Sequence, residues 1–232
     1  MLLKKQSIHI ISFDIFRTLV DLDSRAPKVY ERIFLTKGAP SQVRRFWSDI
    51  GHRYRIELSH SLSKEKYEGF APLFVRVMEW IKNNYNLKGS AEEYKDILIE
   101  EEKQSSLFPD ALDTIHALSK RYTLCVVSDT DPDMVTTILP SIPIKKKFLS
   151  YDHQAYKEDP QNKLFKAVID DFKVDPTHIL HIGDSYSDVI GSKRLNMNSV
   201  WINRYKPWYW WKHKDIQPDH TITALKQLVR LF

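Results

Sequence analysis

Five polar residues fall at or near the expected strand ends and helix starts of a buried sheet, and their types suit phosphoryl transfer. Asp14, Ser128 and Asp184 each follow directly on a short apolar run. Lys157 precedes an amphipathic helical pattern, and Asp188 lies just beyond Asp184. Ligands of open α/β sheets bind beyond the carboxyl ends of the strands, so these side chains are expected to share one crevice. Carboxylates, a hydroxyl and a lysine suit phosphoryl transfer because that chemistry depends mostly on positioning and charge neutralisation.

The apolar runs that carry these residues predict a parallel sheet. Short, nearly continuous, β-branched segments are typical of strands that are covered on both faces. Such segments run over Ile8 to Phe13, Tyr122 to Val127, Lys147 to Leu149, His178 to Ile182 and Ser199 to Ile202. Helical patterns alternate with them, which predicts an α/β fold with a doubly wound parallel sheet.

The helical patterns around the sheet allow more detailed expectations. Asp110 is expected to cap a helix whose apolar face includes Leu112, and a last helix is expected to carry Leu225 and Val229 on its apolar face. The segment Leu164 to Phe172 has a further apolar stripe at helical spacing.

Residues 21–107 interrupt the alternation with helical patterns alone. Ser90 and Glu93 form a predicted capping box, and Pro72 is expected to kink or end a helix within its own pattern. The sequence therefore predicts an α/β core from residues 1–20 and 108–232, into which an all-helical cap is inserted.

Composition and charge exclude several classes of protein. The 232 residues are 42% hydrophobic, which can fill a core, and the formal net charge of +5 is too small to indicate a nucleic-acid partner. Cys125 is the single cysteine, which excludes an internal disulfide and fits a reducing compartment. No apolar run reaches the roughly 18 residues of a membrane span, and the first residues do not match a signal peptide. These features predict a soluble, cytoplasmic protein.

Four short motifs in order resemble those of the haloacid dehalogenase superfamily. The segment from Asp14 to Leu19 looks like the first motif, and Ser128 matches the second. Lys157, followed by Asp-Pro at 159–160, resembles the third, and Gly183-Asp184-Ser185 with Asp188 resembles the fourth. Each motif alone is short, but each one here lies at a predicted strand end or helix start.

The resemblance implies a hydrolase that forms an aspartyl-phosphate on Asp14 and acts on a small phosphorylated metabolite. It implies Mg²⁺ held by Asp14, the Phe16 backbone carbonyl and Asp184, with Asp188 supporting the metal site or orienting Lys157. It also implies that Ser128 and Lys157 bind phosphoryl oxygens.

Two more residues of the first motif receive roles from the resemblance or from their position. Thr18 is implied to form a hydrogen bond near the nucleophile. Arg17, where some similar sequences have an aspartate, either binds a substrate anion or faces solvent.

Phe16 is the difference from the family pattern with the largest consequence for catalysis. Family phosphatases have an aspartate there as general acid and base, and such assistance is typically worth about 10²–10⁴ in rate. The dehalogenases of the superfamily have an aromatic residue there, use no metal and lack the acidic Gly-Asp pair. A buried carboxylate facing Asp14 favours a cation between the two, hence Mg²⁺ and phosphate chemistry. Asp21 and Asp23 are the nearest substitutes for the missing acid.

Two alternatives stay open at this point. One is a metal-independent 2-haloacid dehalogenase, which Phe16 and cap arginines such as Arg44 and Arg45 favour. The other is a catalytically degenerate family member that acts as a binding module. It is favoured by Phe16, Arg17 and an aromatic, lysine-rich loop around Trp208 to Trp211, which could contact a substrate or partner or pack against the protein.

Overall fold

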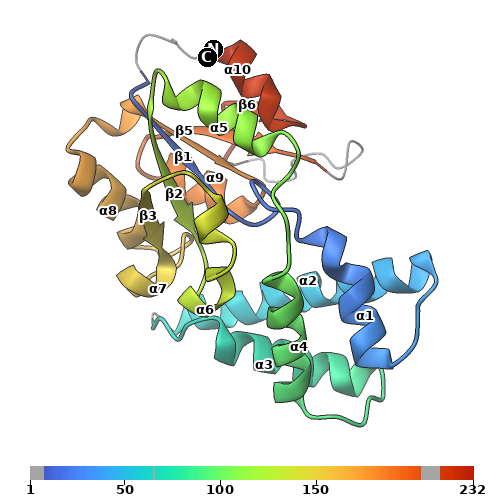
Figure 1. Ribbon diagram of the computed structural model, residues 1–232. Helices are drawn as coiled ribbons and strands as arrows, with labels where there is room; N and C mark the ends of the chain where they lie inside the picture. Colours follow the sequence, from blue (N-terminus) through green and yellow to red (C-terminus); the bar gives the residue numbers. More distant parts are fainter. Residues whose placement is uncertain (1–7, 65, 205–214) are drawn as a thin grey trace. The chain divides into compact units, whose positions relative to one another are not determined.

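Two compact units make up the protein in the computed structural model (Figure 1). The structure describes residues 8–64, 66–204 and 215–232, so the loop around Trp208 to Trp211 lies outside the described residues. The first unit is an α/β core formed by Met1–Asp21, Leu107–Asp129 and Ser141–Phe232. The second is helical and is formed by Leu22–Ser106 and Thr130–Pro140.

A six-stranded, all-parallel sheet forms the centre of the core, with the order β3-β2-β1-β4-β5-β6. The strands are β1 (Ile10–Phe13), β2 (Thr123–Ser128), β3 (Lys146–Leu149), β4 (Ile179–Gly183), β5 (Asn198–Ile202) and β6 (His220–Ile222). The five predicted strands are all present, and the doubly wound parallel sheet is confirmed. The sequence did not indicate β6, because three residues at a sheet edge are too short to show a pattern.

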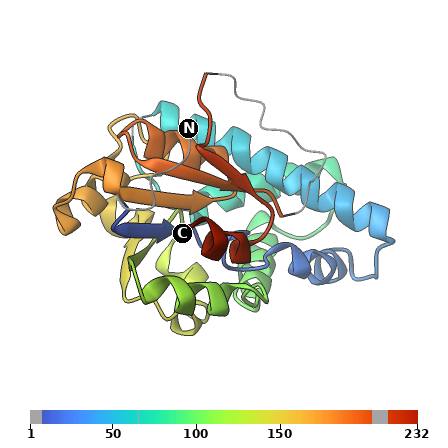
Figure 2. The ribbon, with the colours of Figure 1, turned by 90° about the horizontal axis from the view of Figure 1, so that it is seen from above.

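Helices cover both faces of the sheet. Figure 2 shows α5 (Ala111–Ser119) and α10 (Leu228–Leu231) on one face and α9 (Tyr186–Lys193) on the other. For α5 and α9 this follows from right-handed crossovers, because β1 to β2 and β4 to β5 step in opposite directions across the sheet. The remaining core helices are α7 (Ser150–His153) and α8 (Lys163–Phe172), with 3₁₀ turns at Pro176–His178 and Leu225–Gln227. The buried residues Leu164, Phe165 and Val168 of α8 pack with Ile10 and Ile179 in one apolar cluster.

Three expectations about the core helices were wrong. Asp110 makes no side-chain cap, because its own backbone is already helical and its carboxylate instead accepts from Arg204 at 3.0 Å. Leu112 is 40% exposed, since α5 buries the face with Ala111 and Ile115. The last helix is only four residues long after a 3₁₀ turn, so Val229 points outward and is 45% exposed.

The helical cap contains α1 (Ala26–Phe34), α2 (Pro40–Ser63), α3 (Ala71–Asn84) and α4 (Ala91–Glu102). A 3₁₀ turn, Asp23–Arg25, precedes them, and the short α6 (Pro132–Val135) belongs to the same unit. The predicted capping box is present, with Ser90 accepting from the Glu93 amide at 3.1 Å. Pro72 lies in the first turn of α3, where a missing N–H costs nothing, so it begins the helix and does not kink it.

The segment Thr130–Pro140 groups with the cap, although the sequence pattern placed it in the core. Asp131 explains the grouping, because its carboxylate accepts from the amides of Phe70 and Ala71 at 2.8 and 3.1 Å, at the start of α3. The division at residues 21–107 stays a prediction. No helix in the described part of the chain combines the length and apolar character needed to cross a bilayer.

Candidate active site

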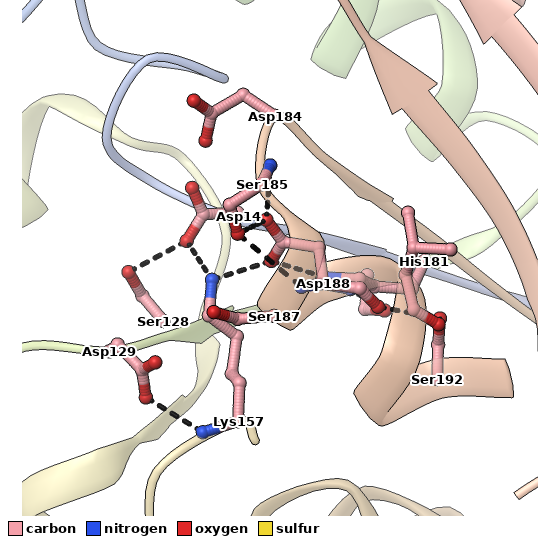
Figure 3. Close-up of polar contacts among 12 residues, drawn as sticks. Asp14, Ser128, Asp129, Lys157, His181, Asp184, Ser185, Ser187, Asp188 and Ser192 are labelled. Carbon is pink, nitrogen blue, oxygen red and sulfur yellow. Dashed lines mark hydrogen bonds and ion pairs between the residues drawn. The ribbon is translucent and has the colours of Figure 1, made fainter. Parts of the chain in front are cut away.

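Asp14 lies directly after β1, where its amide donates to the Ile182 carbonyl of the neighbouring β4 at 2.9 Å. One carboxylate oxygen, Oδ1, accepts from Ser128 Oγ at 3.0 Å and from Lys157 Nζ at 2.8 Å (Figure 3). For the other oxygen, Oδ2, the described residues supply no recorded donor. The carboxylate is therefore fixed through one oxygen and has the other available for chemistry.

Lys157 joins Asp14 to Asp188. Its ammonium lies 2.8 Å from Asp14 Oδ1 and 2.5 Å from Asp188 Oδ1, and all three side chains are buried. Burial alone would lower the pKa of Lys157, but the adjacent carboxylates raise it well above its usual range. Burial likewise opposes ionisation of Asp188, yet Lys157 and His181 bring its pKa below the ordinary value. Lys157 is therefore a permanent cation between two carboxylates.

Both carboxylate oxygens of Asp188 already have hydrogen-bond donors. Oδ1 interacts with Lys157 and with His181 Nε2 at 2.9 Å, and Oδ2 accepts the Ser185 amide at 2.9 Å and its hydroxyl at 2.5 Å. Ser185 caps α9, so the capping box fixes Asp188 in the first turn of that helix. Gly183 makes room for it, since a Cβ there would lie 2.1 Å from Asp188 Cγ. These contacts suit Asp188 for holding Lys157.

Asp184 forms an acidic cluster with Asp14 and Asp188. One carboxylate oxygen from each of the three residues lies within 4.8 Å of the other two. Its backbone carbonyl accepts from Trp201 Nε1 at 2.8 Å. No hydrogen bond to its carboxylate is recorded from the residues that the structure describes. Carboxylate oxygens at this spacing suit a hard cation such as Mg²⁺, and Asp14 and Asp184 each have an oxygen without a recorded donor among the described residues.

Charge at the site is poorly balanced without such a cation. Burial, together with Asp14 and Asp188, raises the pKa of Asp184 to about 8. Burial also raises the pKa of Asp129 to about 7, although Lys157 opposes the shift. Burial raises the pKa of Asp14 too, against the opposing effect of Lys157. These carboxyl groups would thus resist being ionised together unless a cation joined them.

The loop after Asp14 is held in a specific shape. Arg17 adopts a left-handed backbone conformation with φ of 60°, and its charge lowers the pKa of Asp184 against the larger effect of burial. Arg204 Nη2 donates to the Thr18 carbonyl at 2.9 Å. The Thr18 hydroxyl is buried and has no hydrogen-bond partner among the described residues, so the expected bond beside the nucleophile is not formed. Phe16 is half-buried, and the structure records no donor to its carbonyl from the described residues.

Most of the residues singled out from sequence therefore lie together. Ser128 and Lys157 contact Asp14 itself, and their predicted contact with phosphoryl oxygens stays a prediction. Two neighbours were not among the residues assigned to catalysis, metal or substrate: Asp129, which accepts from the Lys157 amide at 2.9 Å, and His181. Asp129 could have been noticed because it follows Ser128 at the end of β2. His181 contacts Asp188 only seven residues along the chain, but its other contact, with Ser12, depends on the pairing of β1 with β4, which the order of strands along the chain does not show.

The raised pKa of Asp184 predicts how metal-free protein responds to pH. The pKa of Asp184 is about 8 in the folded state, against about 3.9 in the unfolded state, so the native state binds the proton more tightly. The stability of the folded protein therefore falls as the pH rises between these two values. In EDTA, calorimetry should find the melting temperature of wild type, relative to that of Asp184→Asn, roughly 3 to 8 °C lower at pH 9 than at pH 6. An exposed control, Asp170→Asn, should track wild type, and an Asp184→Asn variant that also tracked wild type would contradict the assignment.

The chain belongs to the haloacid dehalogenase-like hydrolase family, whose model matches residues 8–196. The fold, the inserted helical cap and the strand-end position of Asp14 agree with that membership. Family membership and the expected resemblance are thereby confirmed, and the protein is a hydrolase of this family.

The similar proteins include members with different reactions. (S)-2-haloacid dehalogenase 4A of Burkholderia cepacia is 24% identical over 203 residues, covering 85% of this chain and 84% of that protein. Glyceraldehyde 3-phosphate phosphatase of Pyrococcus furiosus is 32% identical over 77 residues, covering 31% of this chain and 30% of that protein. The solved L-2-haloacid dehalogenase of Xanthobacter autotrophicus matches with a TM-score of 0.82 at 16% identity, covering 97% of this chain and 98% of the other.

By name, these relatives favour the dehalogenase alternative over the phosphatase interpretation. The phosphatase match covers under a third of either chain, whereas the haloacid dehalogenase match in sequence covers most of both. The structural likeness, at 16% identity, shows the fold and no more. The substrate therefore has to be argued from the side chains at the site.

Proposed function

We propose that this protein is a Mg²⁺-dependent phosphohydrolase that acts on a small phosphorylated metabolite through an aspartyl-phosphate on Asp14. The observation that carries the proposal is the cluster of Asp14, Asp184 and Asp188. A second carboxylate beside the nucleophile would hinder attack on a substrate anion unless a cation were bound. Dehalogenation of a 2-haloacid has no use for that second carboxylate.

The donors at the site fit a magnesium ion. Asp184 and Asp14 Oδ2 have no recorded protein donor among the described residues, and the Phe16 carbonyl is the third oxygen that the family resemblance assigns. Asp188 is saturated by four donors, so we assign it to supporting the site and holding Lys157. When bound, Mg²⁺ would neutralise charge on the phosphoryl oxygens and on these carboxylates.

The chain's own residues then account for two steps. An Asp14 carboxylate oxygen attacks phosphorus, and the bond from phosphorus to the leaving oxygen breaks. Water next attacks the aspartyl-phosphate and releases inorganic phosphate. Lys157, already beside Asp14, is in place to offset charge on the transferring group, and Ser128 holds the nucleophile's Oδ1. Phe16 cannot protonate the leaving oxygen, which favours substrates whose leaving group needs no proton.

A second candidate is the hydrolytic dehalogenation of a 2-haloacid. Phe16 and the long match to (S)-2-haloacid dehalogenase 4A favour it. Asp14 would then displace the halide from carbon to form an ester, which water would hydrolyse. Asp184 argues against this candidate, because an ionised carboxylate there would repel a carboxylate substrate and a protonated one would have no role in the reaction.

One assay separates the two candidates. Hydrolysis of p-nitrophenyl phosphate should require Mg²⁺ and stop in EDTA, and chloride release from 2-chloropropionate should stay at background. Metal-independent chloride release without phosphatase activity would replace the proposal with the second candidate. A folded protein inactive in both assays would favour a binding module.

Phe16 offers a direct test of the missing acid. Phe16→Asp is expected to raise kcat on alkyl phosphates by at least about 10-fold, since general acid catalysis is commonly worth more than that. Phe16→Asn is the matched control, because it has similar size and polarity but cannot transfer a proton. Equal rates for the two variants across a panel of alkyl and aryl phosphates would show that the acid comes from elsewhere, with Asp21 and Asp23 next to be tested.

A further inference from the structure

A line of buried side chains connects the sheet to Asp188. Ser12 of β1 and His181 of β4 are partners in the strand register, and both side chains are fully buried. Ser12 Oγ lies 2.9 Å from His181 Nδ1, and His181 Nε2 lies 2.9 Å from Asp188 Oδ1 (Figure 3 shows His181 beside Asp188). An imidazole enclosed in a sheet core is costly unless both nitrogens are satisfied, and here both are.

The contacts specify which ring nitrogen bears hydrogen. The Asp188 carboxylate is an acceptor, so Nε2 must donate to it. In a neutral ring Nδ1 then has only a lone pair, which accepts the Ser12 hydroxyl hydrogen. The alternative acceptor for that hydroxyl, the Leu180 carbonyl, is farther away at 3.4 Å. Phe165 packs edge-on against the ring with 4.9 Å between centroids, which restricts its rotation.

The same carboxylate oxygen that His181 contacts also holds Lys157. Asp188 Oδ1 interacts with both groups, and Lys157 Nζ in turn contacts Asp14 Oδ1. A small rotation of the Asp188 carboxylate would shift the lysine that fixes the nucleophile. The second oxygen of Asp188 is held by Ser185, whereas among the described residues His181 restrains Oδ1 from the side of the sheet.

We infer that His181, with its tautomer fixed by the Asp188 carboxylate and its ring anchored by Ser12, is a positioning residue that orients Asp188 and thereby keeps Lys157 on the nucleophile Asp14. This inference rests on the proposed role of Asp14. The order serine, histidine, aspartate resembles a hydrolytic triad, but Ser12 is 0% exposed inside β1 and cannot meet a substrate. The three residues therefore act on the geometry of the site and not as a second nucleophilic centre.

The test compares two substitutions of one side chain. His181→Gln places an amide N–H near the position of Nε2, whereas His181→Met fills similar volume with no donor. For Mg²⁺-supported turnover of p-nitrophenyl phosphate, we expect His181→Met to lower kcat about 10- to 100-fold with KM little changed. His181→Gln should recover most of that loss, and Ser12→Ala should give an intermediate decrease. Equal losses in the Gln and Met variants would overturn the inference, because they would indicate packing alone.

A second measurement does not depend on turnover. Ring-nitrogen NMR of the resting wild-type protein should show the His181 Nε2–H tautomer, identified by its absence from His181→Gln. Crystals of His181→Met should show Lys157 Nζ farther from Asp14 Oδ1. An Nδ1–H tautomer, or an unmoved Lys157, would contradict the positioning role. If wild type hydrolysed no phosphate ester, the proposed function would fail while these two results still decided the role of His181.

Discussion

Asp14→Asn is expected to abolish turnover, with kcat falling by about 10³-fold or more, because the amide oxygen is a poor nucleophile. The variant should fold normally. Its amide oxygen can still accept from Ser128 and Lys157, and it removes one of the carboxyl charges that burial disfavours. The measurement is steady-state kinetics on p-nitrophenyl phosphate with Mg²⁺, together with a melting curve to confirm folding.

The control for Asp14→Asn is Asp170→Asn, on the exposed side of α8, which should keep wild-type kinetics. The prediction applies to either candidate reaction, since Asp14 is the nucleophile in both. Residual activity above about 1% of wild type would mean that another group attacks the substrate, and the assignment of Asp14 would be abandoned.

Lys157→Met is expected to have the largest effect on stability. Removing the ammonium leaves Asp14 and Asp188 buried without their shared cation, and breaking a buried ion pair in this way commonly costs about 3–5 kcal/mol. For a chain of this size that corresponds to a melting temperature lower by roughly 6 to 20 °C, measured in EDTA. Activity should fall as well, because of the two recorded donors from the described residues Ser128 would then be left to hold Asp14 Oδ1.

A double substitution separates lost charge balance from lost packing. Adding Asp188→Asn to Lys157→Met removes one of the uncompensated charges, so the pair should be less destabilised than the sum of the single variants. Lys166→Met, on an exposed position of α8, should be close to neutral. If the double variant lost as much stability as the two single variants added together, the ion pairs would contribute little and the effect would come from packing.

The sequence was informative about the core wherever burial was complete. Strands such as β1 and β4 are covered on both faces, which requires continuous apolar runs, and these runs also place Asp14 and Asp184 at strand ends. It was less informative at the edges. The strand β6 is short, and the outward position of Val229 depends on a helix of only four residues. Neither segment is long enough to show a hydrophobic pattern in the sequence.

The site was predictable as a set of residues but not as a network. The motifs indicated Asp14, Ser128, Lys157 and Asp188, yet not that Lys157 joins two carboxylates or that His181 contacts Asp188. The contacts of Lys157 with both carboxylates depend on β4 lying beside β1, although two strands separate them along the chain, whereas His181 and Asp188 are only seven residues apart. The attachment of Thr130–Pro140 to the cap through Asp131 is similarly a long-range contact, which no local pattern encodes.

The state of Asp14 during turnover tests the central claim most directly. Protein mixed with p-nitrophenyl phosphate and Mg²⁺ can be quenched in acid within milliseconds and its peptides analysed by mass spectrometry. The proposed phosphohydrolase predicts a phosphoryl group on the peptide that contains Asp14. The adduct should be absent in EDTA and in Asp14→Asn, and it should accumulate because no acid or base at Phe16 speeds its hydrolysis. Turnover without any adduct on Asp14, or a 1-carboxyethyl ester formed there from 2-chloropropionate without metal, would contradict it.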